Sequence, residues 1–355
     1  MLLDDAEESQ AEEDTKAALN RALRKLDVLK RSRTELVQAV YRAAHDAALT
    51  LDFPAVLTPK ADRRKGRSET AVSVLSDWQL AKITPSYNSE VCEQRIELYG
   101  DKVENLVAIQ RADHPVRDAH IWLLGDLVEG EMVFPGQAHL IDASVYHQSL
   151  VSRPRILGNF IRRMAGLFPG SIHITAVIGN HGRNGRKGEF DPETNWDRVL
   201  YRHTADVLEG RKGLERVSWT IPEGKGESHW YAIDRIGNYG SLLFHGYNLK
   251  GHGGMPWYGL NKKAGGWALG AIDDFILGMA ESMRSGGRMD IDFGHWHQPT
   301  SVTLNRATAR CNGSTESHNT YAQEQLAAVG QPSQGLRFVD PAKGIVTAEY
   351  TVWLD

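Results

Sequence analysis

The chain has 355 residues, with 45 acidic and 41 basic side chains and a formal net charge of -4. This length suits one large α/β domain or two ordinary ones, and the charge gives no global indication of a nucleic-acid partner. Its two cysteines, Cys92 and Cys311, exclude a disulfide scaffold and a cysteine-based zinc cluster. We find no signal peptide and no run near the ~20 apolar residues of a membrane span, so we expect a cytoplasmic protein without a membrane partner.

The N-terminal region differs from the rest of the chain. Residues 15–51 contain no glycine or proline, and their apolar residues keep a spacing of four and three, which predicts one long helix or a helical hairpin. The centre of this stretch is basic. Either its charged face is solvated while the helix packs on the main domain or on a second copy, or it contacts nucleic acid; the first is favoured. With the basic linker at residues 60–67, this predicts a helical extension at 1–65 and a main domain at 66–355.

From residue 71 the pattern changes to short apolar runs that each end in polar residues. Runs of this length, rich in β-branched and large apolar side chains, are typical of buried strands. A helix is expected between the first two, and further strands are expected between residues 301 and 355. Strands that alternate with helices indicate a layered α/β domain. The five runs are residues 71–75, 120–124, 172–178, 241–244 and 289–293.

Residues of metal-ligand type follow all five runs. Taken singly, each has an ordinary structural explanation, such as a capped turn or a buried histidine. Together they are expected to converge at one edge of one sheet, because ligands gather beyond the carboxyl ends of strands. Carboxylate, amide and imidazole donors suit a divalent transition metal, and seven donors are too many for one ion. Two ions about 3.5–4 Å apart that share a carboxylate and a bridging hydroxide would use them all and attack phosphorus. The seven are Asp77, Gln79, Asp126, Asn180, His245, His295 and His297.

In these motifs the sequence resembles the calcineurin-like metallophosphoesterases over about residues 71–355. The family pattern is Asp-x-His, Gly-Asp-x-x-(Asp/Glu), Gly-Asn-His-(Asp/Glu), a lone His and Gly-His-x-His, followed by Asn-Pro-Gly-Ser. The corresponding segments, in the same order, are Asp77-Trp78-Gln79, Gly125-Asp126-Leu127-Val128-Glu129, Gly179-Asn180-His181-Gly182, Phe244-His245-Gly246, Gly294-His295-Trp296-His297 and Cys311-Asn312-Gly313-Ser314.

The resemblance implies a four-layer αββα sandwich and a role for each motif residue. His181 would protonate the leaving oxygen or steady the charged transition state. Glu129 would hold the His181 ring and favour its protonated form. Asp126 would bridge two ions. The first ion would take Asp77, Gln79, Asp126 and His297, and the second would take Asp126, Asn180, His245 and His295.

Two departures from the family pattern affect these expectations. Gln79 replaces the usual histidine, which should weaken and harden the first site and favour Mn²⁺ or Mg²⁺ over Zn²⁺ there. We therefore expect two divalent ions with Mn²⁺ favoured, and with Mg²⁺, Fe²⁺, Ni²⁺ and Zn²⁺ as alternatives. Arg183 stands close after the Asn-His pair, where an acid is common. Its guanidinium would either clamp a phosphate oxygen or bond its own loop.

The layout of the motifs is most similar to the SbcD-type DNA-repair nucleases, in which a partner ATPase takes part. Lysines interleaved with aromatic side chains follow His245, as a site for single-stranded or frayed nucleic acid requires. The alternative is that the aromatic rings pack this loop onto the domain. We expect a phosphodiesterase acting on DNA or another nucleic acid, with homodimerisation through the N-terminal helix as a further expectation. The alternatives are a phosphomonoesterase and a non-catalytic metal-bearing scaffold. The candidate substrate-binding residues are Arg183, Lys250, His252, Trp257 and Tyr258.

Overall fold

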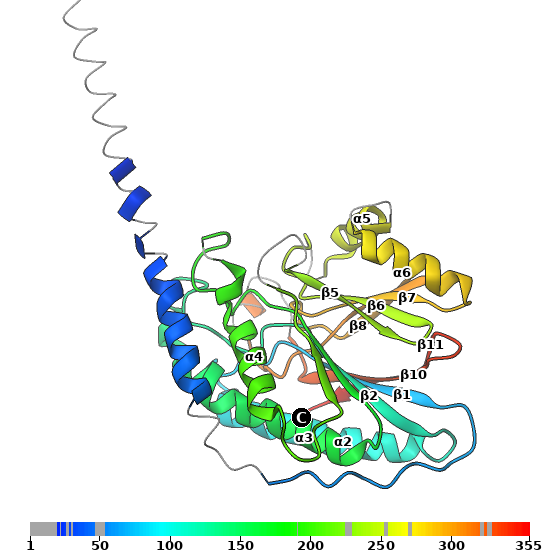
Figure 1. Ribbon diagram of the computed structural model, residues 1–355. Coiled ribbons are helices and arrows are strands. Elements are labelled where there is room, and N and C mark those ends of the chain that lie inside the picture. The colour runs from blue at the N-terminus through cyan, green and yellow to red at the C-terminus, as the bar shows by residue number, and fades with distance from the viewer. Residues whose placement is uncertain are drawn as a thin grey trace, which may run out of the picture.

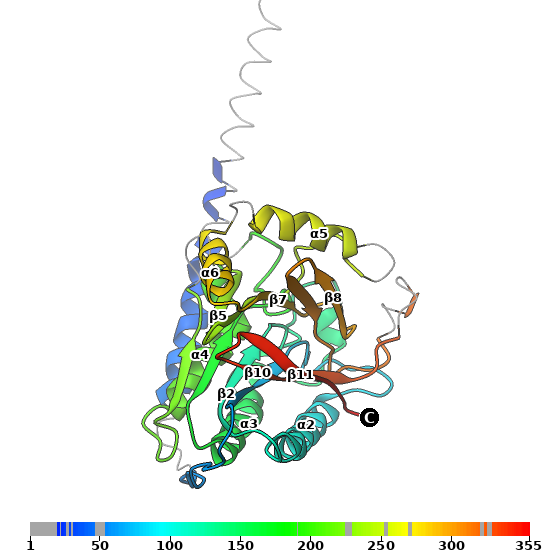
Figure 2. The same cartoon turned by 90° about the vertical axis from the view of Figure 1, so that its right-hand side faces the viewer.

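The computed structural model describes residues 20–21, 23–25, 28–29, 31–46, 54–189, 191–223, 229–251, 255–268, 272–319, 323–324 and 329–355. Two layers of β-sheet lie between two layers of helices (Figures 1 and 2). The expected four-layer αββα sandwich is therefore confirmed.

The first sheet has six strands in the order β11-β10-β1-β2-β3-β4. Strands β1 to β4 are parallel, and β10 and β11 add to the β1 edge in antiparallel pairs. Because parallel strands need crossover connections, helices α2, α3 and α4 lie between them in the chain and cover the outer face (Figure 1). The elements are β1 (Glu69–Leu75), α2 (Ser89–Gln110), β2 (Val116–Leu123), α3 (Arg153–Leu167), β3 (Ile172–Ala176), α4 (Trp196–Leu208), β4 (Val217–Thr220), β10 (Ser333–Asp340) and β11 (Ile345–Trp353).

The second sheet has five strands in the order β5-β6-β7-β9-β8, with parallel pairs β6-β7 and β7-β9 at its centre. Helices α5 and α6 cover its outer face (Figure 2). The elements are β5 (Tyr231–Ile236), β6 (Tyr239–Phe244), α5 (Trp257–Gly266), α6 (Asp273–Arg284), β7 (Met289–Phe293), β8 (Thr300–Leu304) and β9 (Ala307–Cys311). Three short helical turns, η1 (Gln137–His139), η2 (His147–Ser152) and η3 (Pro192–Thr194), lie in the connections of the first half.

Three hydrophobic clusters fill the spaces between the four layers. The largest joins α2, α3 and α4 to the first sheet, and another joins the second sheet to α5 and α6. The third lies between the sheets, where Val72 and Trp122 of the first sheet meet Leu243 of the second. Burying such side chains contributes roughly 1.5–3 kcal/mol each, so the sheets are held face to face mainly by this apolar layer.

All five predicted strands are present, as β1, β2, β3, β6 and β7, but the expectation of a single sheet is wrong. The first three belong to the six-stranded sheet and the last two to the five-stranded sheet. An apolar run indicates a buried strand but does not indicate its pairing partners. The change of sheet occurs within the polar stretch at residues 210–238, which supplies edge strands β4 and β5.

The N-terminal helix packs on the same chain. Residues 31–46 are helical and lie beside α4 (Figure 1). Val37 is buried in the largest cluster, Tyr41 donates a hydrogen bond to Asp206 of α4, and His45 Nδ1 lies 3.6 Å from the same carboxylate. The basic side chains of Arg31 and Arg33 are exposed. The domain boundary at residues 65–66 stays a prediction. Among the described residues, no helix is both long and apolar enough to cross a bilayer.

Candidate metal centre

All seven predicted metal ligands lie in loops that follow strands at one end of the two sheets. Five of them have left-handed backbone, with φ of 51° at Asp77, 41° at Gln79, 52° at Asp126, 73° at His295 and 55° at His297. Only three other non-glycine residues of the described chain share this backbone region. Such conformations cost about 1–3 kcal/mol each and persist where the surroundings impose them, typically at functional sites. The concentration of strain in these loops marks them as a site independently of any family resemblance.

Motif glycines allow the loops to approach closely. A Cβ at Gly179 would lie 2.0 Å from Asp126 Oδ1, and a Cβ at Gly294 would lie 2.4 Å from Asp77 Oδ2. Any side chain at these positions would displace a carboxylate of the donor set. The glycines next to the ligands are therefore needed for the geometry of the ligands themselves.

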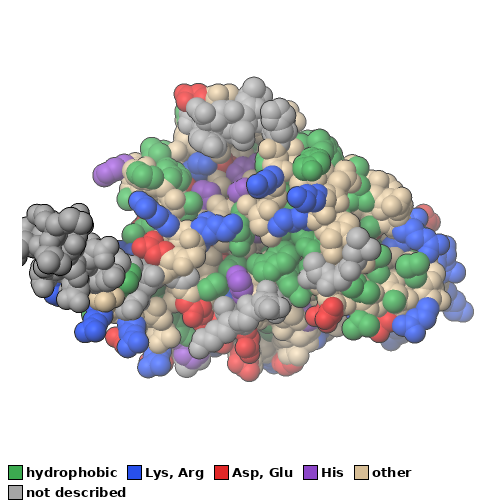
Figure 3. All heavy atoms as spheres, turned by 90° about the horizontal axis from the view of Figure 1, so that it is seen from above, with side chains coloured by type: hydrophobic (Ala, Val, Ile, Leu, Met, Phe, Trp, Pro, Cys, Tyr) green, Lys and Arg blue, Asp and Glu red, His purple; other side chains and the backbone are tan. Residues whose placement is uncertain are grey.

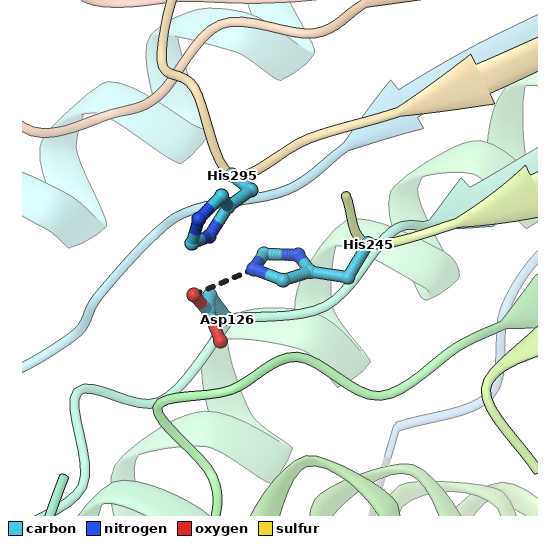
Figure 4. A group of neighbouring side chains, drawn as sticks. All are labelled: Asp126, His245 and His295. Carbon is cyan, nitrogen blue, oxygen red and sulfur yellow. Dashed lines mark ion pairs between the residues drawn. The ribbon is translucent and has the colours of Figure 1, made fainter. Parts of the chain in front are cut away.

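Asp126, His245 and His295 form the tightest part of the centre (Figure 4). One donor atom from each lies within 4.8 Å of the others. His245 Nε2 is 2.7 Å from Asp126 Oδ2, yet neither atom has a hydrogen-bond partner of suitable geometry. The buried acceptor Asn180 Oδ1 has none either. A bound cation would satisfy buried ligand atoms that have no hydrogen-bond partner, so this predicted ligand set fits a divalent ion.

The ring of His245 is oriented for this role. Its Nδ1 lies 2.7 Å from the carbonyl oxygen of Leu124. Since a carbonyl can only accept, Nδ1 carries the proton and Nε2 is left as the atom that faces the centre. The sequence suggested His245 as a ligand, and the backbone partner at the end of β2 shows which nitrogen would bind.

Burial and neighbouring charges shift the pKa values of Asp126, His245 and His295. Burial, together with the charge of His245, lowers the pKa of His295 to about 3, so its imidazole is neutral and offers a lone pair. Burial alone would raise the pKa of Asp126, but His245 and His181 outweigh it and lower that pKa. Burial alone would lower the pKa of His245, but Asp126 outweighs it and raises that pKa to about 9. A proton on His245 thus supplies the positive charge beside Asp126 that a bound ion would otherwise supply.

The other predicted ligand set does not fit as well. His297 Nε2 lies 3.3 Å from Asp77 Oδ1, as expected of neighbouring ligands. Gln79, however, accepts a hydrogen bond at its Oε1 from Lys82 Nζ at 3.1 Å. Its Nε2 lies 3.4 Å from His297 Nε2 and from His181 Nε2. The amide therefore presents a donor, not a lone pair, to the other ligands.

His181 and Glu129 are brought together as the resemblance implied. His181 Nδ1 lies 3.1 Å from Glu129 Oε2, and Gln137 Nε2 donates to Glu129 Oε1 at 3.0 Å. His181 Nε2 lies 4.0 Å from Asp126 Oδ2. Burial alone would lower the pKa of His181, but Glu129 and Asp126 outweigh it and raise the pKa to about 10. The ring is thus held by one nitrogen, while the other faces the donor set.

Asp197, at the start of α4, is a functional residue that the sequence did not reveal. Its buried carboxylate accepts four backbone N–H groups, from Asp126 at 2.9 Å, Leu127 at 3.1 Å, Val128 at 3.2 Å and Gly179 at 2.9 Å. Burial and the nearby Asp126 raise its pKa to about 6. One side chain therefore joins the loops after β2 and β3. The only sequence signal was an acid in the first turn of a helix, after the N-cap Asn195.

Arg183 stacks on an aromatic ring at the edge of the centre. Its guanidinium lies 4.6 Å from the centroid of Tyr247, and Lys187 Nζ lies 5.5 Å from the same centroid. Tyr247 is 6.2 Å from His245, ring to ring. Lys263 is close enough to Lys187 for that charge, after burial, to lower its pKa. We call Arg183, Lys187 and Lys263 the basic rim. Figure 3 shows, by side-chain type alone, histidines in a hollow of the surface with Lys and Arg side chains around it.

The other predicted substrate-binding residues are not joined to the centre. Lys250 and Tyr258 are exposed and Trp257 is 43% exposed, and in the described chain no hydrogen bond or ion pair links them to the donor set. His252 lies outside the described residues. The prediction of a loop here is partly wrong, because residues from Trp257 form helix α5. The nearby glycines indicated a loop, but Gly259 sits inside the helix, where a Cβ would lie 2.3 Å from the Lys250 carbonyl oxygen.

Comparison with known proteins gives a likeness to solved structures alone. No protein-family model and no curated protein matches the chain. Similar structures include an archaeal phosphodiesterase, with 11% identity over 79% of this chain and 99% of that chain and a TM-score of 0.34. Vps29 from Entamoeba histolytica, complexed with zinc, has 12% identity over 80% of this chain and 99% of that chain, with a TM-score of 0.33. A phosphoesterase from E. coli has 11% identity over 79% of this chain and 99% of that chain, with a TM-score of 0.32. TM-scores this low say nothing about function, which has to come from the chain's own residues.

Proposed function

We propose that this chain is a metal-dependent phosphoesterase that hydrolyses phosphodiester bonds in DNA or another nucleic acid. The observation that carries the proposal is the cluster of Asp126, His245 and His295, whose donor atoms lie within 4.8 Å of one another. His181 Nε2 lies 4.0 Å from Asp126 Oδ2. Among the described residues, the buried atoms Asp126 Oδ2, His245 Nε2 and Asn180 Oδ1 have no hydrogen-bond partner of suitable geometry. A divalent ion held there would neutralise phosphate charge and make hydroxide available at neutral pH.

The residues around the ion would divide the remaining work. Glu129 and Gln137 fix the His181 ring, so that Nε2 faces the centre and can deliver a proton to the leaving oxygen. The raised pKa of His181 favours the protonated form that this step needs. Asp197 holds the loops of Asp126 and Asn180 in register by accepting their backbone N–H groups. His181 is thus the general acid, Glu129 and Gln137 support it, and Asp197 is a positioning residue.

The basic rim supports a polyanionic substrate over a small phosphomonoester. Arg183 and Lys187 beside Tyr247, with Lys263 close to Lys187, provide positive charge for several phosphates, and the Tyr247 ring can stack on a base. Tyr258 and Trp257 offer further stacking surface, because 78% and 43% of these residues remain exposed although they lie on α5.

A substrate panel tests the proposal. The protein is stripped with a chelator, reloaded with Mn²⁺ and assayed on bis-p-nitrophenyl phosphate, p-nitrophenyl phosphate and labelled single- and double-stranded DNA and RNA. We expect metal-dependent cleavage of the diester and of at least one nucleic acid, and none by Asp126→Asn. Turnover of the monoester alone would replace the diesterase with a phosphomonoesterase, and no turnover of any substrate would favour a non-catalytic scaffold.

A further inference from the structure

Lys82 places a positive charge inside the first predicted ligand set. Lys82 follows β1 in the same loop as Asp77 and Gln79. Its backbone forms an isolated β-bridge with Ile141. Its side chain is only 16% exposed. Nζ lies 3.1 Å from Gln79 Oε1 and 2.6 Å from Glu316 Oε1. The ammonium is therefore built into the centre and is not a mobile surface charge.

The contact with Lys82 settles the orientation of the Gln79 amide. An ammonium group can only donate hydrogen bonds, so the atom of Gln79 that faces it must be the oxygen. The amide nitrogen then faces His297 and His181, at 3.4 Å from each Nε2. An amide N–H cannot bind a metal ion. Turning the amide over would place two donors, Nε2 and Lys82 Nζ, against each other.

Glu316 holds Lys82 where it is. Its carboxylate is 1% exposed, and its second oxygen lies 3.4 Å from His297 Nδ1 and accepts a hydrogen bond from Asn319 at 3.2 Å. Glu316 thus bridges Lys82 and a predicted ligand of the first ion. A buried carboxylate with these contacts fixes both partners, because a buried charge left without its counter-charge is costly.

The charges of this region balance with one divalent ion. The buried carboxylates of Asp77, Asp126 and Glu316 supply three negative charges. One divalent ion and the Lys82 ammonium supply three positive charges. Glu129 instead contacts His181, with Oε2 3.1 Å from Nδ1, and Asp197 accepts four backbone N–H groups. A second divalent ion beside the ammonium would add two positive charges that the first three carboxylates do not balance.

We propose that the centre holds one resident divalent ion, at Asp126, Asn180, His245 and His295, and that the Lys82 ammonium takes the place of a second ion. This inference depends on the proposed function only in that both need a metal ion at the Asp126 set. Gln79 is then a support for Lys82 and His297, and not a metal ligand. This role explains why glutamine stands where the family pattern has histidine. The amide offers the ammonium a carbonyl oxygen as acceptor, and an imidazole has none.

Metal stoichiometry and electron paramagnetic resonance test the inference without any substrate. The apoprotein is dialysed against Mn²⁺, and bound Mn²⁺ per chain is measured together with its spectrum. We expect one Mn²⁺ per wild-type chain with the signal of an isolated ion. The double variant Gln79→His/Lys82→Met restores a nitrogen ligand and removes the ammonium. It should bind a second Mn²⁺ and show a spin-coupled spectrum.

Lys102→Met is the matched control, because Lys102 is also partly buried and donates to an oxygen, the Trp353 carbonyl at 2.6 Å, but lies on α2. It should keep one Mn²⁺. Two coupled Mn²⁺ in the wild type would overturn the inference, as would a folded double variant that still binds one. If the double variant does not fold, the wild-type stoichiometry decides alone. One bound Mn²⁺ without turnover would contradict the proposed function and support this inference. Two bound Mn²⁺ with turnover would contradict this inference and support the proposed function.

Discussion

Asp197 connects two loops of the centre through a single carboxylate. Asparagine at this position keeps the shape but replaces one acceptor oxygen with a donor that faces backbone N–H groups. We predict that Asp197→Asn lowers the free energy of unfolding by about 2–4 kcal/mol, because several buried donors lose their acceptor. Mn²⁺ affinity should fall by about 10–100-fold, since the backbone of Asp126 is no longer held. Urea denaturation and a metal titration measure the two effects.

Asp274→Asn is the control for this variant, because Asp274 is an exposed acid in the first turn of α6, as Asp197 is a buried acid in the first turn of α4. Its unfolding free energy should stay within about 0.5 kcal/mol of the wild type. An Asp197→Asn protein with wild-type Mn²⁺ affinity would show that the carboxylate does not position the ligands.

His181 is expected to act on the leaving group and not on metal binding. We predict that His181→Ala lowers turnover of DNA by about 10²–10⁴-fold, the usual contribution of a general acid. The loss should be much smaller on bis-p-nitrophenyl phosphate, because p-nitrophenolate leaves without protonation. Bound Mn²⁺ should not change. Equal losses on both substrates, or full activity on DNA, would contradict the assignment.

The sequence predicted the donor residues but not what holds them. Asp77, Asp126 and His245 could be predicted because each directly follows an apolar strand, and strand ends are readable from local pattern. Lys82, Glu316 and Asp197 could not, because their roles come from contacts made only after folding. Glu316, for example, meets a loop more than 200 residues earlier in the chain. The choice between one ion and two depends on these supporting residues.

The N-terminal helix is attached to α4 through a titratable pair. Burial, and after it the hydrogen bond to Asp206, raises the pKa of Tyr41 above its ordinary value of about 10. A raised pKa in the folded state means that this stabilisation is complete below pH ~10 and is lost as the pH rises further. We predict that residues 31–46 lose hydrogen-exchange protection progressively as the pH rises above about 10 in the wild type. In Tyr41→Phe their protection should be lower at neutral pH and nearly independent of pH.

Tyr258→Phe is the control for the helix experiment, because Tyr258 is 78% exposed and lies on α5. It should reproduce the wild-type pH dependence. A Tyr41→Phe protein that loses protection at the same pH as the wild type would show that another group releases the helix.

At the level of elements, the sequence located strands and helices better than it located their neighbours. The expected helix after β1 is present as α2, and the expected strands near the C-terminus are β8 to β11. The assignment to one sheet failed because both sheets have fully buried central strands, and a buried strand has the same apolar pattern in either sheet. Helix α5 was missed because Gly259, Gly265 and Gly266 lower its helix propensity, while packing on the second sheet overrides it.

Over the whole molecule, a net charge of -4 does not describe the surface that a substrate meets. We predict that replacing Arg183, Lys187 and Lys263 with glutamine weakens DNA binding and reduces the slope of log affinity against log salt by about 2–3 for duplex DNA, because each phosphate contact contributes about 0.9. Turnover of bis-p-nitrophenyl phosphate should be little changed. Binding titrations at several salt concentrations measure the slope.

A triple variant of exposed basic residues away from the site loops, Lys212, Arg284 and Lys343 to glutamine, controls for the change in net charge. It should keep the wild-type salt slope. An unchanged slope in the basic-rim variant would mean that these side chains do not contact phosphates.

The donor set draws on both sheets, and this determines when during folding it can exist. Asp77 and the backbone of His295 meet across 218 residues of chain, so the centre forms only after the two sheets have packed. A contact absent from the transition state for folding slows unfolding and leaves the folding rate unchanged. We predict that Mn²⁺ at 100 times its dissociation constant adds about 2.7 kcal/mol of stability, all of it in a slower unfolding rate in stopped-flow experiments. Metal supply would then set how long a folded chain survives, and not how fast it forms.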